Sequence, residues 1–157
     1  MSNNRIPIHS ILGSDVVEKI SGWAEKSPTI SELVEFLSLE FQIDITSDLD
    51  IVNGYERDCS NINGNAEVLC RPINELECAL VLRCCQSVKI PQTISAGRTN
   101  LTGSATPEGG VILSIEKMTQ PKVKVDSASK TITTPVGIYL EDMRKEVLRQ
   151  SNKTLHY

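Results

Sequence analysis

The sequence has no apolar run long enough to cross a membrane. The longest uninterrupted run covers only residues 78–82, whereas a spanning helix needs about 20 apolar residues, and no signal-peptide core follows the first residues. It also has no excess of positive charge, since 16 Lys and Arg stand against 20 Asp and Glu and the pI is about 5.2. The basic stripe typical of nucleic-acid-binding proteins is therefore missing. We expect a soluble, cytoplasmic protein without a transmembrane segment or a nucleic-acid partner.

A disulfide framework and a cysteine-based metal motif are missing as well. The five cysteines lie at positions 59, 70, 78, 84 and 85, and no C-x-x-C occurs. An odd number of cysteines without a secretory signal favours reduced thiols. We expect these side chains to behave as small buried apolar groups, and we expect no metal site.

Two common phosphate-binding motifs are also absent. A P-loop has four residues between its glycines and then Lys followed by Ser or Thr. Here five residues separate Gly97 from Gly103, and Ser104 stands where the lysine would be needed. The Rossmann fingerprint is excluded because no G-x-G occurs anywhere in the chain.

A different glycine-containing loop is present at residues 95–107, which read SAGRTNLTGSATP between two apolar, strand-like segments. Gly97 and Gly103 carry no Cβ, and Asn100 accepts a positive φ at low cost. Successive N–H groups in such a loop can form an anion-binding nest. The side chains that could assist are the hydroxyls of Thr99, Thr102 and Ser104 and the fixed charge of Arg98. The pattern predicts a phosphate or diphosphate site, and a tight surface turn without a ligand is the alternative.

Read with its flanks, the loop resembles the diphosphate loop of the para-cresol methylhydroxylase/vanillyl-alcohol oxidase type of FAD-binding domain. The nearest branch is the D-2-hydroxyacid dehydrogenases and glycolate oxidase subunits, whose loop reads approximately R-G-G-R-T-G-L-T-G-G-A-x-P. The positions that match are Gly97, Arg98, Thr99, Leu101, Thr102, Gly103, Ala105 and Pro107. Those that depart are Ser95, Ala96, Asn100 and Ser104. Upstream, Tyr55, Asp58 and Ser60 match the Y-x-x-D-x-S segment that this family commonly places before its first strand.

The resemblance implies which residues contact the cofactor. The loop residues expected to hold the diphosphate of FAD are Ala96, Gly97, Arg98, Thr99, Asn100, Leu101, Thr102, Gly103 and Ser104. Val136 and Gly137 are implied on the adenine side, because the family places a valine–glycine step there. The loop has no histidine for a covalent link, so we expect non-covalent FAD. No catalytic residue is assigned to this chain.

The pattern along the chain predicts an α+β fold, with a small sheet that has a parallel βαβ core and a hairpin. Residues 1–13 are expected to form a poorly ordered lead-in. Two helices should follow, one capped by Ser14 and one by the pair Thr29 and Glu32, and residues 43–64 are expected to be irregular. The predicted later elements are strand 68–70, a helix that opens with a capping box of Asn74 and Glu77 and ends near Ser87, strands 90–94 and 111–115, and a hairpin of 122–126 with 131–133. Leu76 should widen the apolar face of that helix. A last helix over 139–150 should have an apolar stripe of Leu140, Met143 and Val147. We expect strands 68–70 and 90–94 to form a parallel pair with a right-handed crossover.

We predict two parts, an N-terminal helical extension over residues 1–50 and the N-terminal lobe of the FAD-binding domain over residues 51–157. The chain ends before the segments that complete the flavin site and the substrate domain in the resembled family. The parent enzyme is therefore expected to oxidise a D-2-hydroxy acid, such as D-lactate, glycolate or D-2-hydroxyglutarate, by hydride transfer to FAD. That substrate would bind through the missing C-terminal part, and this fragment alone should be inactive. The alternatives are a truncated α/β module that no longer binds FAD, and a different enzyme on the same flavin fold, such as an ether-lipid synthase or a sugar-nucleotide reductase.

Overall fold

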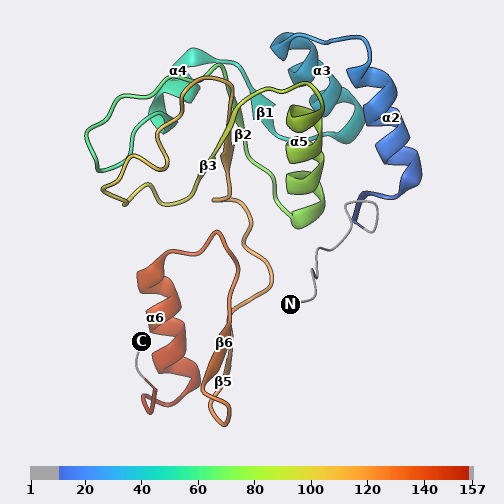
Figure 1. The fold of residues 1–157 in the computed structure, drawn as a ribbon. Helices are drawn as coiled ribbons and strands as arrows, with labels where there is room; N and C mark the ends of the chain where they lie inside the picture. The colour runs from blue at the N-terminus through green and yellow to red at the C-terminus, as the bar shows by residue number, and fades with distance from the viewer. Residues whose placement is uncertain (1–10, 156–157) are drawn as a thin grey trace, which may run out of the picture.

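The computed structural model describes residues 11–155 and shows a mixed α+β fold. In Figure 1 a small sheet lies beside helices α2, α3 and α5, and a hairpin with helix α6 forms a second group toward the C-terminus. The predicted class, a small sheet with a hairpin and flanking helices, is confirmed. None of the helices in the described part is long and apolar enough to cross a membrane.

The main sheet has four strands in the order β1-β2-β4-β3. Strand β1 (Ile45–Thr46) is antiparallel to β2 (Val68–Cys70), and β4 (Val111–Ser114) is parallel both to β2 and to β3 (Gln92–Ser95). The expected pairing of the strands on either side of the connecting helix is wrong in one respect. Those strands, β2 and β3, do run parallel, but β4 lies between them. The segments that follow β2, β3 and β4 consequently leave the same edge of the sheet.

One face of the sheet carries the larger core. Helices α2 (Ser14–Ala24), α3 (Ile30–Phe41) and α5 (Glu75–Ser87) cover the strand residues that point to this side. The fully buried members from the helices and strands include Ile20, Leu33, Leu37, Val81, Val111 and Leu113. On the opposite face, Leu69 and Ile112 pack with Val52 of the short helix α4 (Leu49–Val52). Alternate strand residues point to alternate faces, as the pleat requires.

Helix capping was predicted with mixed success. Thr29 and Glu32 form the expected capping box at the start of α3. Asn74 caps α5 by accepting from the Glu77 N–H, but the Glu77 carboxylate accepts from the Ile73 N–H instead of closing the box. The prediction that Ser14 caps α2 is wrong. Gly13 occupies the capping position, with no side chain to offer and a φ of 74°.

Three stretches differ from the sequence-based expectation. Leu12 is buried in the core, so the predicted poorly ordered lead-in does not extend to that residue, and its residues 1–10 lie outside the described part. Within 43–64 the chain forms β1, α4 and the 3-10 turn η1 (Asn53–Tyr55). These elements are too short to produce a periodic pattern. On α5 the buried face includes Cys84, while Leu76, which was expected to widen that face, is exposed.

The C-terminal group consists of β5 (Lys124–Asp126), β6 (Thr131–Thr133) and α6 (Leu140–Gln150). Met143 and Val147 of α6 are buried, whereas Leu140, predicted to lie on the same apolar stripe, is exposed. The amide of Gln150 joins the helix to the hairpin, because its oxygen accepts from the Val125 N–H at 3.0 Å and its nitrogen donates to the Val123 carbonyl at 2.9 Å. The predicted division at residue 50 stays a prediction. Helices α2 and α3 share their core with α5 and the sheet.

Candidate functional site

The glycine-containing loop leaves the carboxyl end of β3 and returns to β4 through the turn at Gly109 and Gly110. Within residues 11–155, no backbone N–H group from Ala96 to Ser104 donates to a protein atom. The next donor along the chain is the Ala105 N–H, which is directed at the carboxylate of Asp58. Nine consecutive N–H groups are thus left for water or a ligand. A stretch of unpaired amides of this kind is the feature that an anion-binding loop requires.

Asp58 anchors the far side of the loop. Its carboxylate accepts from the Ser60 N–H at 2.8 Å, from the side-chain amide of Asn100 and from the Ala105 N–H at 3.4 Å. Hydrogen bonds from Ser60 are the largest cause that lowers the pKa of Asp58, and those from Ala105 and Asn100 lower it further. The Cys59 N–H also donates to the Asn100 carbonyl at 3.1 Å. The Tyr55–Ser60 segment therefore supports the loop directly.

Asn100 does not adopt the left-handed conformation that its type permits. The positive φ values in the loop belong to Arg98 (52°) and Gly103 (74°). Asn100 instead uses its side chain, which bridges Asp58 and the Ser104 hydroxyl, the latter at 3.0 Å. Gly103 has a second reason to be glycine, because a Cβ there would lie 2.7 Å from the terminal methyl of Ile62.

Arg98 lies over the ring of Tyr55, with its guanidinium carbon 4.4 Å from the ring centroid. This geometry is a cation–π contact. One guanidinium nitrogen, Nη1, is buried and has no hydrogen-bond partner among the described residues. Tyr55 in turn donates its hydroxyl to Glu116 Oε1 at 2.5 Å. Burial is the main cause that raises the pKa of Tyr55, and the bond to Glu116 raises it further, so the hydroxyl keeps the proton that it donates.

A second charged cluster lies at the same edge of the sheet, where β2 ends. Asp44 accepts from Arg71 at 3.0 Å and from Lys117 at 2.5 Å. Burial alone would raise the pKa of Asp44, but the hydrogen bonds from Lys117 and Arg71 outweigh it and lower that pKa. These ion pairs fix the segments that follow β2 and β4.

A cleft of about 370 Å³ brings the loop together with the segment that enters α6. The predicted site residues that line it are Ala96, Gly97, Thr99, Val136 and Gly137. The other predicted residues, Arg98, Asn100, Leu101, Thr102, Gly103 and Ser104, do not line the cleft. Arg98 is directed at Tyr55, and Asn100 at Asp58. The structure thus joins two segments that are about 40 residues apart in the sequence.

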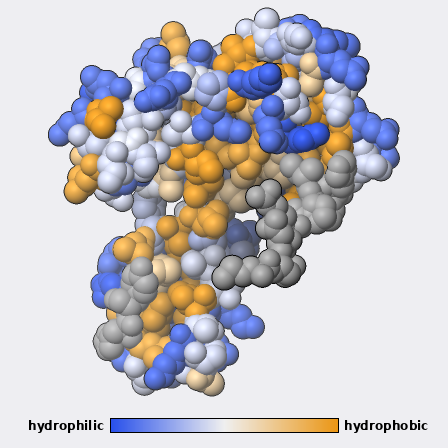
Figure 2. Space-filling model, in the orientation of Figure 1, coloured by the Kyte–Doolittle hydropathy of each residue, from blue (hydrophilic) through white to orange (hydrophobic). Residues whose placement is uncertain are grey.

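The cleft also contains residues that the sequence did not single out. They are Ile115, Glu116, Ile138, Tyr139, Leu140 and Glu141. Val136 and Leu140 are 58% and 61% exposed, and Figure 2 shows apolar surface between the upper and lower parts of the molecule. The sequence placed Leu140 on the apolar stripe of its helix, so the exposure of this leucine in the cleft could not be read from the pattern. Nothing in the local sequence pointed to Glu116.

Position 137 requires glycine for a structural reason that does not depend on a ligand. A Cβ on it would lie 2.5 Å from the Ile115 carbonyl oxygen, 2.9 Å from that of Glu116 and 3.0 Å from that of Met118. Its N–H donates to the Met118 carbonyl at 3.0 Å. This close backbone contact holds the entry to α6 against the segment after β4. It therefore forms one wall of the cleft, whether or not Gly137 touches a ligand.

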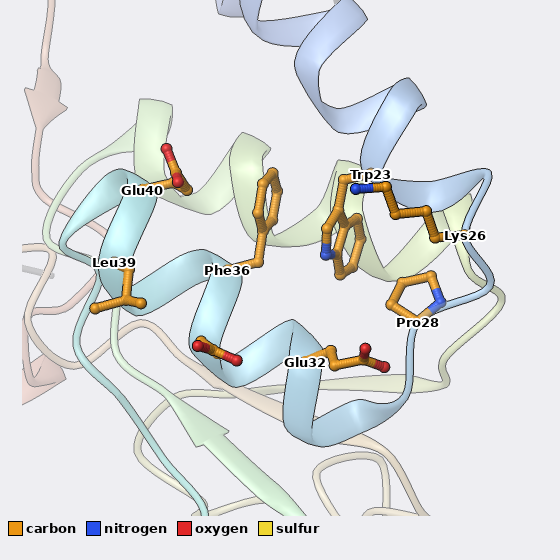
Figure 3. Close-up of a pocket in the computed structure, with 8 residues that line it drawn as sticks. Trp23, Lys26, Pro28, Glu32, Phe36, Leu39 and Glu40 are labelled. Carbon is orange, nitrogen blue, oxygen red and sulfur yellow. The ribbon is translucent and has the colours of Figure 1, made fainter.

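A separate cavity of about 270 Å³ lies at helices α2 and α3 (Figure 3). The rings of Trp23 and Phe36 stack there with centroids 4.5 Å apart. Its carboxylates include Glu32, which caps α3, and Glu40, which pairs with Lys19. None of the predicted site residues lies in this cavity, and two of its carboxylates are already engaged by α2 and α3. We therefore regard the cleft at the glycine-containing loop as the candidate functional site.

Comparison with known proteins finds a matching family, a relative in sequence and several similar structures. The family described as FAD binding domain matches residues 66–155. A D-lactate dehydrogenase from Archaeoglobus fulgidus is 31% identical over 83 residues, which are 52% of this chain and 18% of that protein.

Two solved oxidase structures illustrate the similarity of fold. A xylooligosaccharide oxidase from Myceliophthora thermophila superimposes with a TM-score of 0.62 at 12% identity, over 78% of this chain and 26% of that one. A glucooligosaccharide oxidase from Acremonium strictum, studied for its 6-S-cysteinyl, 8α-N1-histidyl FAD, gives 0.60 at 17% identity, over 76% and 25%. The chain thus spans about a quarter or less of the length of the proteins that it matches.

Proposed function

The chain belongs to the FAD-binding domain family that matches residues 66–155, and from this premise we propose that its loop and cleft bind the ADP half of FAD in an oxidoreductase of D-2-hydroxy acids. The family consists of FAD-dependent oxidoreductases, so the cofactor class follows from membership. What we propose is which residues contact FAD and which class of substrate the enzyme oxidises.

The observation that carries the site assignment is the row of unpaired N–H groups from Ala96 to Ser104. They stand at the carboxyl ends of the parallel strands, where α/β sheets usually bind nucleotides. The buried, unpartnered Nη1 of Arg98 adds a donor next to this row. The residues present therefore fit a diphosphate.

In this arrangement the amides of residues 97–104 hold the diphosphate, with the hydroxyls of Thr99 and Thr102 as further donors. Arg98 offsets the negative charge, and Val136 and Gly137 contact the adenine side. A bound flavin supplies the hydride acceptor, and the protein supplies placement and electrostatics. The loop contains no histidine, in keeping with non-covalent binding.

The substrate class is supported by the resemblance of the loop to the D-2-hydroxyacid dehydrogenases and by the D-lactate dehydrogenase relative. The substrate would bind to parts of the protein that this chain does not include. In the protein that carries this lobe, we expect D-lactate, glycolate or D-2-hydroxyglutarate to bleach the flavin. Bleaching by an oligosaccharide such as xylobiose, and by none of these acids, would contradict the proposal.

One observation favours the alternative of a module that no longer binds FAD. The charged residues that line the cleft are Glu116 and Glu141, and no Lys or Arg lines it within the described residues. A diphosphate facing these carboxylates would be repelled. The proposal therefore requires the diphosphate to lie against the loop amides, away from Glu116.

The direct test is calorimetric titration of residues 1–157 with FAD, with FMN as the control, which lacks the AMP part and keeps only one of the two phosphates. We expect weak binding, in the micromolar range or above, since the chain spans about a quarter of the solved flavoproteins. FMN should bind more weakly, and Arg98→Ala should weaken FAD binding without unfolding the protein. Absence of FAD binding at millimolar concentration would support the non-binding module.

A further inference from the structure

Glu116 occupies a fixed position on the wall of the cleft. It follows β4, is half-buried, and also lines a second cavity of about 350 Å³ that shares Gly137 and Tyr139 with the cleft. Tyr55 donates to its Oε1 at 2.5 Å. The close contact of Gly137 with the Glu116 carbonyl fixes the backbone at the same place. The carboxylate is therefore held before any ligand arrives.

The second oxygen of Glu116 has no partner among residues 11–155. A carboxylate can accept about four hydrogen bonds, so one from Tyr55 leaves most of this capacity unused. The other carboxylate of the cleft, that of Glu141, differs in this respect. Both of its oxygens accept from Arg144, at 2.7 and 2.8 Å. Of the two carboxylates that line the cleft, Glu116 is thus the one with an oxygen left for a ligand.

The negative charge of Glu116 decides which part of a nucleotide can lie beside this residue. A diphosphate offers only acceptors and carries the same sign of charge, so it is repelled by Glu116 and attracted by the unpaired amides of residues 96–104. The ribose of the adenosine half offers two neighbouring hydroxyl donors. A carboxylate with free lone pairs matches such a diol.

We propose that Glu116, positioned by Tyr55, binds the ribose hydroxyls of the adenosine half of the nucleotide. This inference rests on the proposed function. It adds one residue to that site and states the direction in which the nucleotide lies there. The diphosphate lies along the loop, and the ribose lies between the loop and the entry to α6.

The test compares ADP with 2′,3′-dideoxy-ADP by NMR titration of the 157-residue chain. We expect the wild type to prefer ADP by roughly tenfold, the size of one charge-assisted hydrogen bond. Glu116→Ala should abolish this preference, and Tyr55→Phe should reduce it. Glu141→Ala is the matched control, since that carboxylate is already paired, and it should keep the preference. If Glu116→Ala does not fold, Glu116→Gln serves in its place, because its amide nitrogen cannot accept.

The possible outcomes distinguish the role of Glu116 from the proposed binding of FAD, on which it rests. Tighter ADP binding by Glu116→Ala would mean that the carboxylate only repels nucleotides, and the inference would be wrong. A preference for the diol that survives in Glu116→Ala would also overturn it, while leaving the FAD site intact. If the wild type binds neither ADP nor FAD, the proposed function is wrong as well.

Discussion

The guanidinium of Arg98 is stacked on Tyr55, with 4.4 Å between its central carbon and the ring centroid. The two residues are 43 positions apart, and the cation of the loop is therefore placed by a segment that precedes the first parallel strand. Arg98 has a positive φ of 52°, which is uncommon for a long side chain. The stack compensates for part of that cost.

Replacing Tyr55 separates the contribution of the ring from that of the hydroxyl. Tyr55→Leu loses both the stack and the bond to Glu116, so we expect a loss of about 1–3 kcal/mol in the free energy of unfolding. Tyr55→Phe keeps the ring over which Arg98 lies and should cost about 1 kcal/mol. Urea denaturation of the three proteins measures both values. Equal costs for the two variants would mean that the stack contributes nothing.

Two glycines of the cleft should respond in opposite ways to alanine. A Cβ on Gly137 meets three backbone carbonyl oxygens within 3.0 Å, and backbone cannot yield cheaply. We expect Gly137→Ala to cost about 1–3 kcal/mol or more in stability. A Cβ on Gly97 meets nothing within 4 Å, so Gly97→Ala should leave the stability unchanged or raise it by about 0.5 kcal/mol.

The same pair tests the role of the loop. Gly97→Ala is expected to weaken FAD binding, because the added methyl group lies where the diphosphate approaches the backbone. Thermal melting and FAD titration on each variant give the two readouts. A Gly97→Ala protein that binds FAD like the wild type would show that the ligand does not approach this residue.

Local features were predictable where side chain and backbone interact within a few residues. The capping box of Thr29 and Glu32 and the buried strand β2 are examples, since each depends on near neighbours. The insertion of β4 between β2 and β3 could not be read from periodicity, because strand order depends on long-range packing. In the loop, residue types indicated an anion site, but not that Arg98 would be directed at Tyr55. Glu116 was missed because a single glutamate after a strand has no distinctive pattern.

The ion pairs of Asp44 predict a dependence of stability on pH. The folded-state pKa of Asp44 is lowered, so its contribution is complete above the unfolded value of about 3.9 and is lost as the pH falls through the folded value. We expect Asp44→Asn to cost about 1 kcal/mol at pH 7, because the pairs are partly exposed. The difference should shrink as the pH falls from the unfolded value through the lowered folded value. Lys117→Met should cost less, since Arg71 remains paired. Denaturation midpoints across this range measure the effect.

The thiols should differ sharply in reactivity. Cys59 is exposed, Cys78 is half-buried with a pKa that burial raises, and Cys70, Cys84 and Cys85 are buried. Burial raises the pKa of Cys84 and of Cys85 to about 12, and the thiolate is the reactive form. At pH 8 a disulfide reagent should react quickly with one thiol per chain, and Cys59→Ser should abolish this phase. Fast reaction of two or more thiols would show that the core around α5 opens readily.

The anchoring of the loop by Asp58 can be tested without a ligand. In Asp58→Asn, one carboxylate oxygen is replaced by an NH2 group, so the side chain can no longer accept from the Ser60 N–H on one side and from Asn100 and the Ala105 N–H on the other. We expect faster hydrogen exchange at Ala105 and weaker FAD binding, with little change in the melting temperature, because Asp58 is not part of the hydrophobic core. Asp126→Asn is the matched control. Asp126 accepts from backbone N–H groups of the hairpin turn in a similar way, at Ala128 and Ser129.

The pH dependence of exchange gives an independent check on the same anchor. Since the folded-state pKa of Asp58 lies below its usual value, protection of Ala105 in the wild type should persist as the pH falls to about 4, and decline only as the pH passes through the lowered value. Asp58→Asn should lack this transition, whereas Asp126→Asn should retain it. If Ala105 exchanges equally fast in the wild type and in Asp58→Asn, the carboxylate does not hold the loop, and the unpaired amides from Ala96 to Ser104 owe their arrangement to other contacts.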